Sequence, residues 1–312
     1  MKIAVLDDYQ DVALRMADWS GLADRAQIDV YNDHLADSDS DAVVKRLQPY
    51  DIVCVMRERT PLNRGIIERL PNLKLIASSG PRNASIDLEA AAARGIKVVH
   101  TGYFGSPTVE LTWALILGSA RHLTEEAAAV RRGGWQHTIG DDLSGQTLGI
   151  LGLGSIGSKV AQVALAFGMK VIAWSQNLTA EKAAAAGAAL VSKDDLLRQS
   201  DFVSIHLVLS DRTRGLIGAR ELSLMKPSAR LINTSRGPIV VEAGLVHALN
   251  ARKIAFAAID VYDTEPLPPD HPYRHLANLL ATPHIGYVSR SLYERFYRDT
   301  VSNILAWLDA RG

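Results

Sequence analysis

Three segments in the last third of the sequence each place one reactive side chain after an apolar run. Arg236 follows the buried-looking run 231–235, Glu265 lies in an acidic, proline-stiffened loop after 258–261, and His284 lies at a short strand end. Histidine exchanges a proton near neutral pH. A neighbouring carboxylate favours its protonated form, and a guanidinium holds an anion in a planar fork. Together the three fit acid–base chemistry on a small anion, although each alone also fits a structural role.

A glycine pattern earlier in the chain predicts a phosphate-binding turn. The apolar run 148–151 leads directly into G-x-G-x-x-G, made by Gly152, Gly154 and Gly157, with Ser155 and Ile156 between the last two. The first glycine permits a tight turn, the second lets backbone approach a pyrophosphate, and the third lets strand and helix pack closely. A strand before, a helix after and a second strand at 170–174 supply the context that the motif requires. A glycine-rich turn without a ligand is the alternative.

The end of the 170–174 strand bears on the choice of cofactor. NAD-binding versions of this turn carry a carboxylate there, which binds the ribose hydroxyls. Here the position holds Ser175, followed by Gln176 and Asn177, and the next basic residue is Lys182. Neither a carboxylate that would repel a 2′-phosphate nor an adjacent arginine is present, so the sequence allows NAD or NADP. The alternative is that Ser175 is a loop residue without a role in binding the cofactor.

Short Val- and Ile-rich runs alternate with helical patterns along most of the chain. This alternation predicts βαβ units, parallel sheets and helices on both faces. In such sheets ligands bind at the carboxyl ends of the strands, where the reactive residues above would lie. The expected strands are 2–6, 51–55, 73–77, 96–99, 147–151, 170–174, 201–205, 230–234 and 254–259; the expected helices are 39–47, 87–94, 155–167, 179–186, 193–199 and 242–250.

Two further helical stretches suggest a discontinuous organisation. One begins near Pro107, a residue suited to a first helical turn, and the other spans about 289–308. A self-contained run between them holds the glycine pattern. We therefore expect an α/β protein with two Rossmann-like, doubly wound parallel-sheet domains. A nucleotide-binding domain at 102–284 would be inserted into a flavodoxin-like substrate domain made of 1–101 and 285–312, with the ligand bound in the cleft between them.

Composition argues against several other classes of protein. The 312 residues include 34 basic and 34 acidic side chains, so no broad charge favours nucleic acid or an anionic membrane. No apolar stretch reaches the ~20 residues that span a bilayer, and the N-terminus begins as a strand, not a signal peptide. Cys54 lies in an apolar run and predicts a buried thiol. No cluster suggests a metal, and these absences favour a cytoplasmic protein.

At this point the chain resembles the D-isomer-specific 2-hydroxyacid dehydrogenases, over nearly its whole length. The resemblance lies in the 148–157 loop and the segments Asn-Thr-Ser-Arg-Gly, Asp-Val…Glu-Pro-Leu-Pro and Pro-His-Ile-Gly. It implies an enzyme that transfers a hydride between NAD(P)H and the 2-carbon of a small 2-oxo or 2-hydroxy acid. It also implies a homodimer, with helix 107–120 as a candidate contact, although the periodicity of that helix fits internal packing equally well. Implied site residues are the catalytic triad Arg236, Glu265 and His284, the nicotinamide partner Asp260, and cofactor contacts at Thr234 and Gly286.

One loop departs from the family pattern. Many relatives carry Gly-x-Gly where this chain has Gly80-Pro81-Arg82, directly after Ser79. Proline has no N–H, so one expected donor to the substrate carboxylate is missing. Ser79, Gly80, Arg82 and Arg57 are candidate substrate-binding residues, and Arg82 suggests a second anionic group on the substrate. A surface arginine or a subunit contact is the alternative.

Two other functions are compatible with the same scaffold. A formate dehydrogenase needs no acid–base pair, and formate enzymes of the family carry Gln where this chain has Glu265, which disfavours that activity. An NAD(P)-sensing protein like the transcriptional corepressors that share the fold and triad is the second. Turnover measurements would separate it from an enzyme, because a shared fold does not establish a function.

Overall fold

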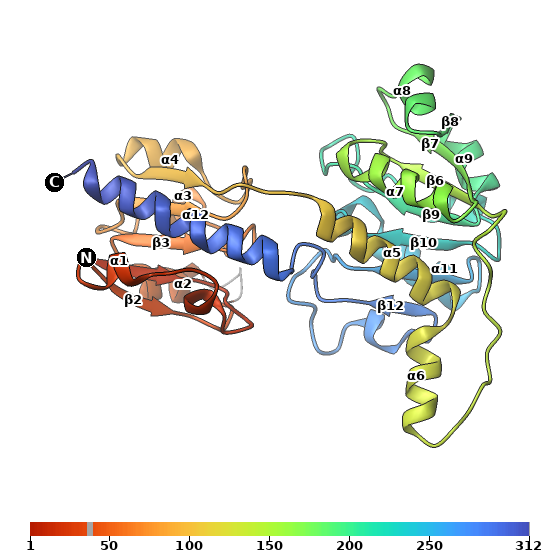
Figure 1. Cartoon of the computed structure of the whole chain (residues 1–312), viewed down its shortest axis with the longest axis horizontal. Coiled ribbons are helices and arrows are strands. Elements are labelled where there is room, and N and C mark those ends of the chain that lie inside the picture. Colours follow the sequence, from red (N-terminus) through yellow and green to blue (C-terminus); the bar gives the residue numbers. More distant parts are fainter. Residues whose placement is uncertain (36–39, 312) are drawn as a thin grey trace. The chain divides into compact units, whose positions relative to one another are not determined.

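The computed structural model describes residues 1–35 and 40–311 (Figure 1). The chain forms two compact units. Unit 1 consists of Met1–Phe104 and Val288–Gly312, and unit 2 of Gly105–Tyr287. Position 39, the first residue of the expected helix 39–47, lies outside the described residues, as does Gly312.

Unit 1 is built on a five-stranded parallel sheet. Its strand order is β2-β1-β3-β4-β5, the flavodoxin-like order, and the order reverses between β1 and β3. Most of its strand residues are buried, because helices cover both faces. The strands are β1 (Lys2–Val5), β2 (Gln27–Val30), β3 (Ile52–Val55), β4 (Leu75–Ser78) and β5 (Lys97–His100).

Helices on the two faces bury alternate residues of these strands. The apolar sides of α2 (Ser40–Leu47), α3 (Arg64–Ile67) and α4 (Leu88–Ala93) enclose one core with Val53, Val55 and Ile76. The long α12 (Arg290–Asp309) packs against β4, β5 and α1 (Ser20–Ala23), and Figure 1 shows it running along the sheet of unit 1. Cys54 is buried, as expected, and burial raises the pKa of its thiol to about 12.

Unit 2 is built on a seven-stranded parallel sheet in the order β12-β11-β10-β9-β6-β7-β8. The chain proceeds outward from β6 to β8 and then returns to β9 on the other side. This reversal makes the carboxyl edge between β6 and β9 the switch point at which such sheets bind ligands. The strands are β6 (Thr147–Leu151), β7 (Lys170–Trp174), β8 (Ala189–Leu190), β9 (Phe202–Ile205), β10 (Arg230–Asn233), β11 (Phe256–Ile259) and β12 (Leu279–Ala281).

Two cores lie on opposite faces of this sheet. One packs α5 (Ser106–Ala120) and α7 (Ser155–Ala166) against strand residues such as Leu148 and Ile150. The other packs α9 (Lys193–Gln199), α10 (Ala219–Leu224) and α11 (Glu242–Asn250) against residues such as Leu151 and Leu231. The remaining elements are α6 (Leu123–Arg131), α8 (Ala180–Ala185), η1 (Ala13–Arg15), η2 (Gly237–Ile239) and η3 (Pro272–His275).

The fold class is confirmed: two α/β units with parallel sheets. Every expected strand is present within a few residues of its predicted bounds. The edge strands β2 and β8 and the helices α1, α3, α6 and α10 were not among the elements expected from the sequence. No helix in the described part of the chain has the length and apolar character needed to cross a membrane.

Candidate active site

The glycine turn after β6 lies at the switch point of unit 2, against the end of β9. Gly152 has φ +100, and a Cβ at this position would lie 2.6 Å from the His206 carbonyl oxygen. A Cβ on Gly157 would lie 2.1 Å from the Gly152 carbonyl oxygen, so α7 can begin this close to the turn only with glycine. A Cβ on Gly154 would meet nothing within 4 Å. The backbone at Gly154 is therefore open to an approaching ligand.

The start of α7 suits a pyrophosphate. Gly154 is the N-cap residue, and no side chain caps the helix there. Ser155 and Ile156 form the first turn, where N–H groups and the helix dipole favour an anion. Ser175 and Asn177 follow β7 at the same sheet edge, and no carboxylate stands between them. These residues fit a dinucleotide with its pyrophosphate on α7, and they neither require nor repel a 2′-phosphate.

His284 and Glu265 form a direct pair at the carboxyl ends of β12 and β11. His284 Nδ1 lies 2.5 Å from Glu265 Oε2, while Glu265 Oε1 accepts the Tyr262 N–H at 3.0 Å. Burial would raise the pKa of Glu265. The hydrogen bond and charge of His284, the Tyr262 N–H and the charge of Arg236 outweigh it, so this pKa lies below its ordinary value. Glu265 is therefore an anion at neutral pH, and Nε2 of His284 has no hydrogen-bond partner within residues 1–35 and 40–311.

The turn that carries His284 is tied to a buried carboxylate. Asp260 is 1% exposed and follows β11. Its Oδ1 accepts the Thr282 hydroxyl at 2.6 Å and the Ile285 N–H at 2.8 Å, and its Oδ2 accepts the Gly286 N–H at 2.7 Å. Burial raises the pKa of Asp260 against these hydrogen bonds. The Asp260 side chain thus fixes both sides of a turn in which His284 itself adopts φ +52, a strained conformation for a non-glycine residue.

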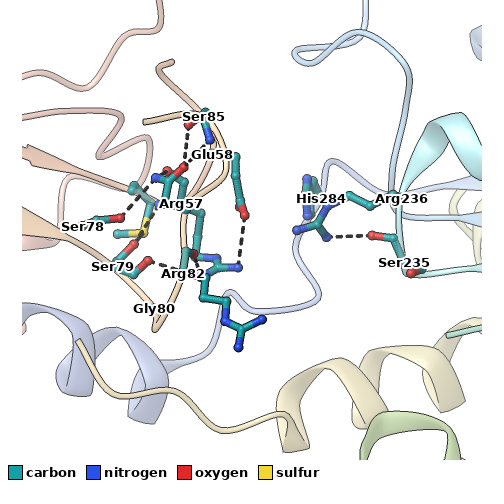
Figure 2. A network of polar contacts seen from close by, with 12 residues as sticks. Arg57, Glu58, Ser78, Ser79, Gly80, Arg82, Ser85, Ser235, Arg236 and His284 are labelled. Atoms are coloured by element: carbon teal, nitrogen blue, oxygen red, sulfur yellow. Dashed lines mark hydrogen bonds and ion pairs between the residues drawn. The ribbon is translucent and has the colours of Figure 1, made fainter. Parts of the chain in front are cut away.

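Arg236 lies after β10, in a segment held by its own side chains. Asn233 Nδ2 donates to the Arg236 carbonyl at 3.0 Å, and Asn233 Oδ1 accepts the Ser235 N–H at 3.0 Å. Figure 2 shows the Arg236 guanidinium donating to the Ser235 carbonyl, at 2.8 Å, with His284 in the same view. The hydroxyl of Thr234, an expected cofactor contact, is paired with the Thr112 hydroxyl of α5 at 2.8 Å.

Another histidine at this edge behaves differently from His284. His206 follows β9, and its Nε2 is 2.9 Å from the Ser204 hydroxyl. Burial lowers the pKa of His206 to about 4, so its ring is neutral at neutral pH. His206 is therefore a poor proton donor, and its contact with Ser204 gives it a structural role at the switch point.

The candidate substrate loop lies in unit 1, after β4. Ser79 and Gly80 are buried, whereas Arg82 is exposed (Figure 2). Arg57 is directed inward instead of into solvent, with its guanidinium against Gly80. The sequence analysis missed Asn83, the buried side chain that joins this loop to the end of β3. No sequence signal could have found it, because its partners lie up to 26 residues away.

Comparison with known proteins identifies the family. A sequence profile described as "D-isomer specific 2-hydroxyacid dehydrogenase, NAD binding domain" matches residues 113–286, more than half of the chain. The chain belongs to the D-isomer-specific 2-hydroxyacid dehydrogenase family. It is accordingly an NAD-dependent oxidoreductase of the 2-hydroxyacid dehydrogenase type.

Relatives and solved structures agree with this assignment. The chain is 41% identical to a glyoxylate reductase of Aeropyrum pernix over 256 residues, 79% of this chain and 76% of that protein. It is 35% identical to a hydroxypyruvate reductase of Thermotoga maritima over 289 residues, 91% and 92% of the two chains. A crystal structure of a putative D-3-phosphoglycerate dehydrogenase from Ralstonia solanacearum is 39% identical, with a TM-score of 0.92, over 100% of this chain and 95% of that one.

Proposed function

We propose that this dehydrogenase interconverts a small 2-oxo acid and its D-2-hydroxy acid, with His284 as the acid and base. The observation that carries the proposal is the His284–Glu265 pair at the carboxyl edge of the nucleotide-binding sheet. When bound, the nicotinamide cofactor supplies or accepts the hydride. The chain's own residues must then bind the acid, orient it and move one proton.

The proton is assigned to His284 Nε2. Nδ1 is held by Glu265, so the tautomer and orientation of the ring are set and Nε2 remains for the substrate oxygen. In the direction of reduction, Nε2 donates to the carbonyl oxygen as negative charge develops there; in the direction of oxidation, the same atom accepts the hydroxyl proton.

Arg236 is assigned to the substrate's polar end. A guanidinium can hold a carboxylate through two parallel N–H donors and polarise an adjacent carbonyl. Its charge already acts on Glu265, which places it near the acid–base pair within unit 2. We assign Asp260 to positioning the His284 turn, since both its carboxylate oxygens accept donors from that turn or from Thr282.

We further propose that unit 2 binds the dinucleotide, through Gly152, Gly154 and the first turn of α7, and that unit 1 binds the substrate. Ser175 and Asn177 at the end of β7 would accept NAD or NADP, because no carboxylate there opposes a 2′-phosphate.

A homodimer is the proposed assembly, with residues 135–139 at the subunit contact, because the other interpretation of helix 107–120, internal packing, agrees with the structure. That helix, α5, is largely buried within unit 2 against α7, β10 and β11. Two large apolar side chains in the segment after α6 are exposed instead: Trp135 is 75% and Ile139 94% exposed. Monomeric proteins rarely leave such side chains clustered in water, which supports a second copy of the chain as the partner.

The decisive experiment is a screen for reduction of glyoxylate, hydroxypyruvate, pyruvate and larger 2-oxo acids with NADH and NADPH. His284→Gln should lower kcat by about 10²-fold or more, the scale of general acid–base catalysis, while NADH still binds. His275→Gln, a change at an exposed histidine in η3, is the control. Near-normal turnover in His284→Gln refutes the assignment of His284. Cofactor binding without turnover of any acid would favour the NAD(P)-sensing protein, and oxidation of formate alone the formate dehydrogenase.

A further inference from the structure

The loop at residues 79–83 in unit 1 is fixed by long-range hydrogen bonds. Asn83, 6% exposed, donates through Nδ2 to the Arg57 carbonyl at 2.6 Å and to the Ser78 hydroxyl at 3.1 Å. The Gly80 N–H donates to the Thr101 hydroxyl at 2.7 Å. The loop that follows β4 is therefore joined to the ends of β3 and β5. A surface loop that only connects two elements needs no such bracing.

The side chain of Arg57 also stabilises the loop at residues 79–83. Its backbone has φ +55, and a Cβ at Gly80 would lie 1.8 Å from its Nη1, so the close approach requires glycine. The guanidinium donates to the carbonyls of Ser79 at 3.3 Å and Arg82 at 3.4 Å, and it pairs with Glu58 at 3.5 Å. The Arg57 guanidinium thus has its hydrogen-bond and ion-pair partners within unit 1 (Figure 2).

Arg59, the other arginine after β3, is also engaged by its own unit. Its guanidinium lies over the Tyr9 ring, 4.3 Å from the centroid, and donates to the Asp7 carbonyl at 2.7 Å. Asp7 follows β1, so this bond spans the switch point of the unit 1 sheet. Arg57 and Arg59 therefore both stabilise the loops at the carboxyl edge of the unit 1 sheet.

Arg82 differs from these two arginines. It is exposed, and within the described part of the chain its guanidinium makes no hydrogen bond, ion pair or aromatic contact. The N–H groups of Arg82 and Asn83 likewise donate to no acceptor among the described residues, and Pro81 has no N–H. A loop whose backbone is held by hydrogen bonds thus presents an uncommitted guanidinium at the carboxyl edge of a parallel sheet, where ligands bind. A backbone that is already held lowers the cost of binding.

We propose that Arg82 binds a second anionic group of the substrate, a carboxylate or a phosphate ester on the carbon chain beyond the 2-oxo acid group. This inference rests on the proposed function. The planar guanidinium matches both anions through two parallel donors. Since Arg57 and Arg59 are already engaged within unit 1, Arg82 would set the preference for a 2-oxo acid with a second anionic group over one without it.

The test uses two matched pairs of substrates on the purified full chain with NADH or NADPH. Oxaloacetate differs from pyruvate by a carboxylate, and 3-phosphohydroxypyruvate differs from hydroxypyruvate by a phosphate. The quantity measured is the ratio of kcat/KM for the acid with the second anionic group to that for its counterpart without it. Arg82→Ala should lower this ratio about ten- to a hundredfold for the matching pair, the scale of a charge-assisted hydrogen bond. Arg82→Lys should restore part of it, because lysine keeps the charge but lacks the fork.

Arg298→Ala is the matched control, since Arg298 is another exposed arginine of unit 1 without a hydrogen bond or ion pair in the described chain. It should leave both ratios unchanged. The pair whose ratio falls in Arg82→Ala identifies the anion as carboxylate or phosphate. Turnover with both ratios unchanged in Arg82→Ala and Arg82→Lys overturns this inference alone, even if solution mass or thermal stability changes. Absence of turnover with every 2-oxo acid overturns the proposed function and this inference together.

Discussion

His284 Nδ1 and Glu265 Oε2 are 2.5 Å apart, although the two residues are separated by 19 positions and follow different strands. β11 and β12 are parallel neighbours, so their carboxyl ends meet at one edge of the sheet. The pairing therefore follows from strand order, and it leaves His284 Nε2 as the ring atom available for proton transfer. The pairing depends on the charge of Glu265, because it is the Glu265 carboxylate that holds His284 Nδ1.

Glu265→Gln should change the response of the protein to acid. Because the pKa of Glu265 lies below its ordinary value of 4.5, the folded state binds this proton less tightly than the unfolded state does. The carboxylate thus contributes stability that is fully present above the unfolded pKa and is lost as pH falls through the folded pKa. The Tm difference between the native protein and Glu265→Gln should be constant from pH 7 to about 5 and should shrink below the ordinary value.

Turnover provides an independent measurement on the same variant. Loss of the group that holds His284 in its tautomer should lower kcat by about 10²-fold or more. Glu294→Gln, a change on α12, serves as the control for loss of a carboxylate. A Tm difference that persists unchanged to pH 3 would show that Glu265 is not held ionised by His284 and Arg236.

Asp260→Asn should loosen the turn that carries His284. The amide has one acceptor oxygen where the carboxylate has two, so the Ile285 or Gly286 N–H loses its partner. An unsatisfied buried donor costs about 1–3 kcal/mol, which lowers Tm by several degrees in a domain of this size. We also expect kcat to fall more than KM rises, because the change displaces the proton donor.

Asp270→Asn, on the exposed loop before η3, is the comparison for this variant. Thermal melts and steady-state kinetics on both proteins check the prediction. Equal Tm values for Asp260→Asn and Asp270→Asn would mean that the Asp260 hydrogen bonds contribute nothing to the turn.

The sequence predicted those parts of the fold that depend on local patterns. Apolar runs located the strands, and the glycine spacing located the turn at Gly152, because tight backbone approach leaves few alternatives to glycine. Strand β2 was not predicted, because it is an edge strand with at most intermediate burial and its sequence pattern is therefore only weakly apolar. Helix α6 has few buried residues and therefore lacks a clear apolar stripe.

The supporting contacts of the site could not be predicted in this way. Arg57 was a candidate substrate ligand because it follows a strand, but the structure packs its guanidinium against Gly80. The family resemblance implies that Asp260 contacts the nicotinamide, which stays a prediction; the structure adds that its carboxylate holds the His284 turn. Both roles depend on residues far apart in sequence, and a single sequence without its tertiary contacts does not reveal which partner a charged side chain selects.

Ser175→Asp should shift cofactor preference toward NADH. The new carboxylate at the end of β7 would accept the ribose hydroxyls and repel a 2′-phosphate. The ratio of kcat/KM for NADH to that for NADPH should rise about tenfold or more, since each ~1.4 kcal/mol of repulsion is a factor of ten. Ser223→Asp adds the same charge on α10 and should leave the ratio as it was. If both variants behave alike, residue 175 does not discriminate between the cofactors.

Ile139→Glu should convert the proposed homodimer to a monomer. Ile139 is 94% exposed and Trp135, four residues earlier, 75% exposed, in the segment that follows α6. If a second copy covers this segment, a glutamate at position 139 must be desolvated without a partner, which costs far more than the lost apolar contact. The mass measured by light scattering should then fall to that of one chain, about half the native value. Leu88→Glu places the same charge on an exposed leucine of α4, and its mass should match that of the native protein. A native protein that already has the mass of one chain, or an Ile139→Glu variant that keeps the mass of two, would remove this segment as the subunit contact.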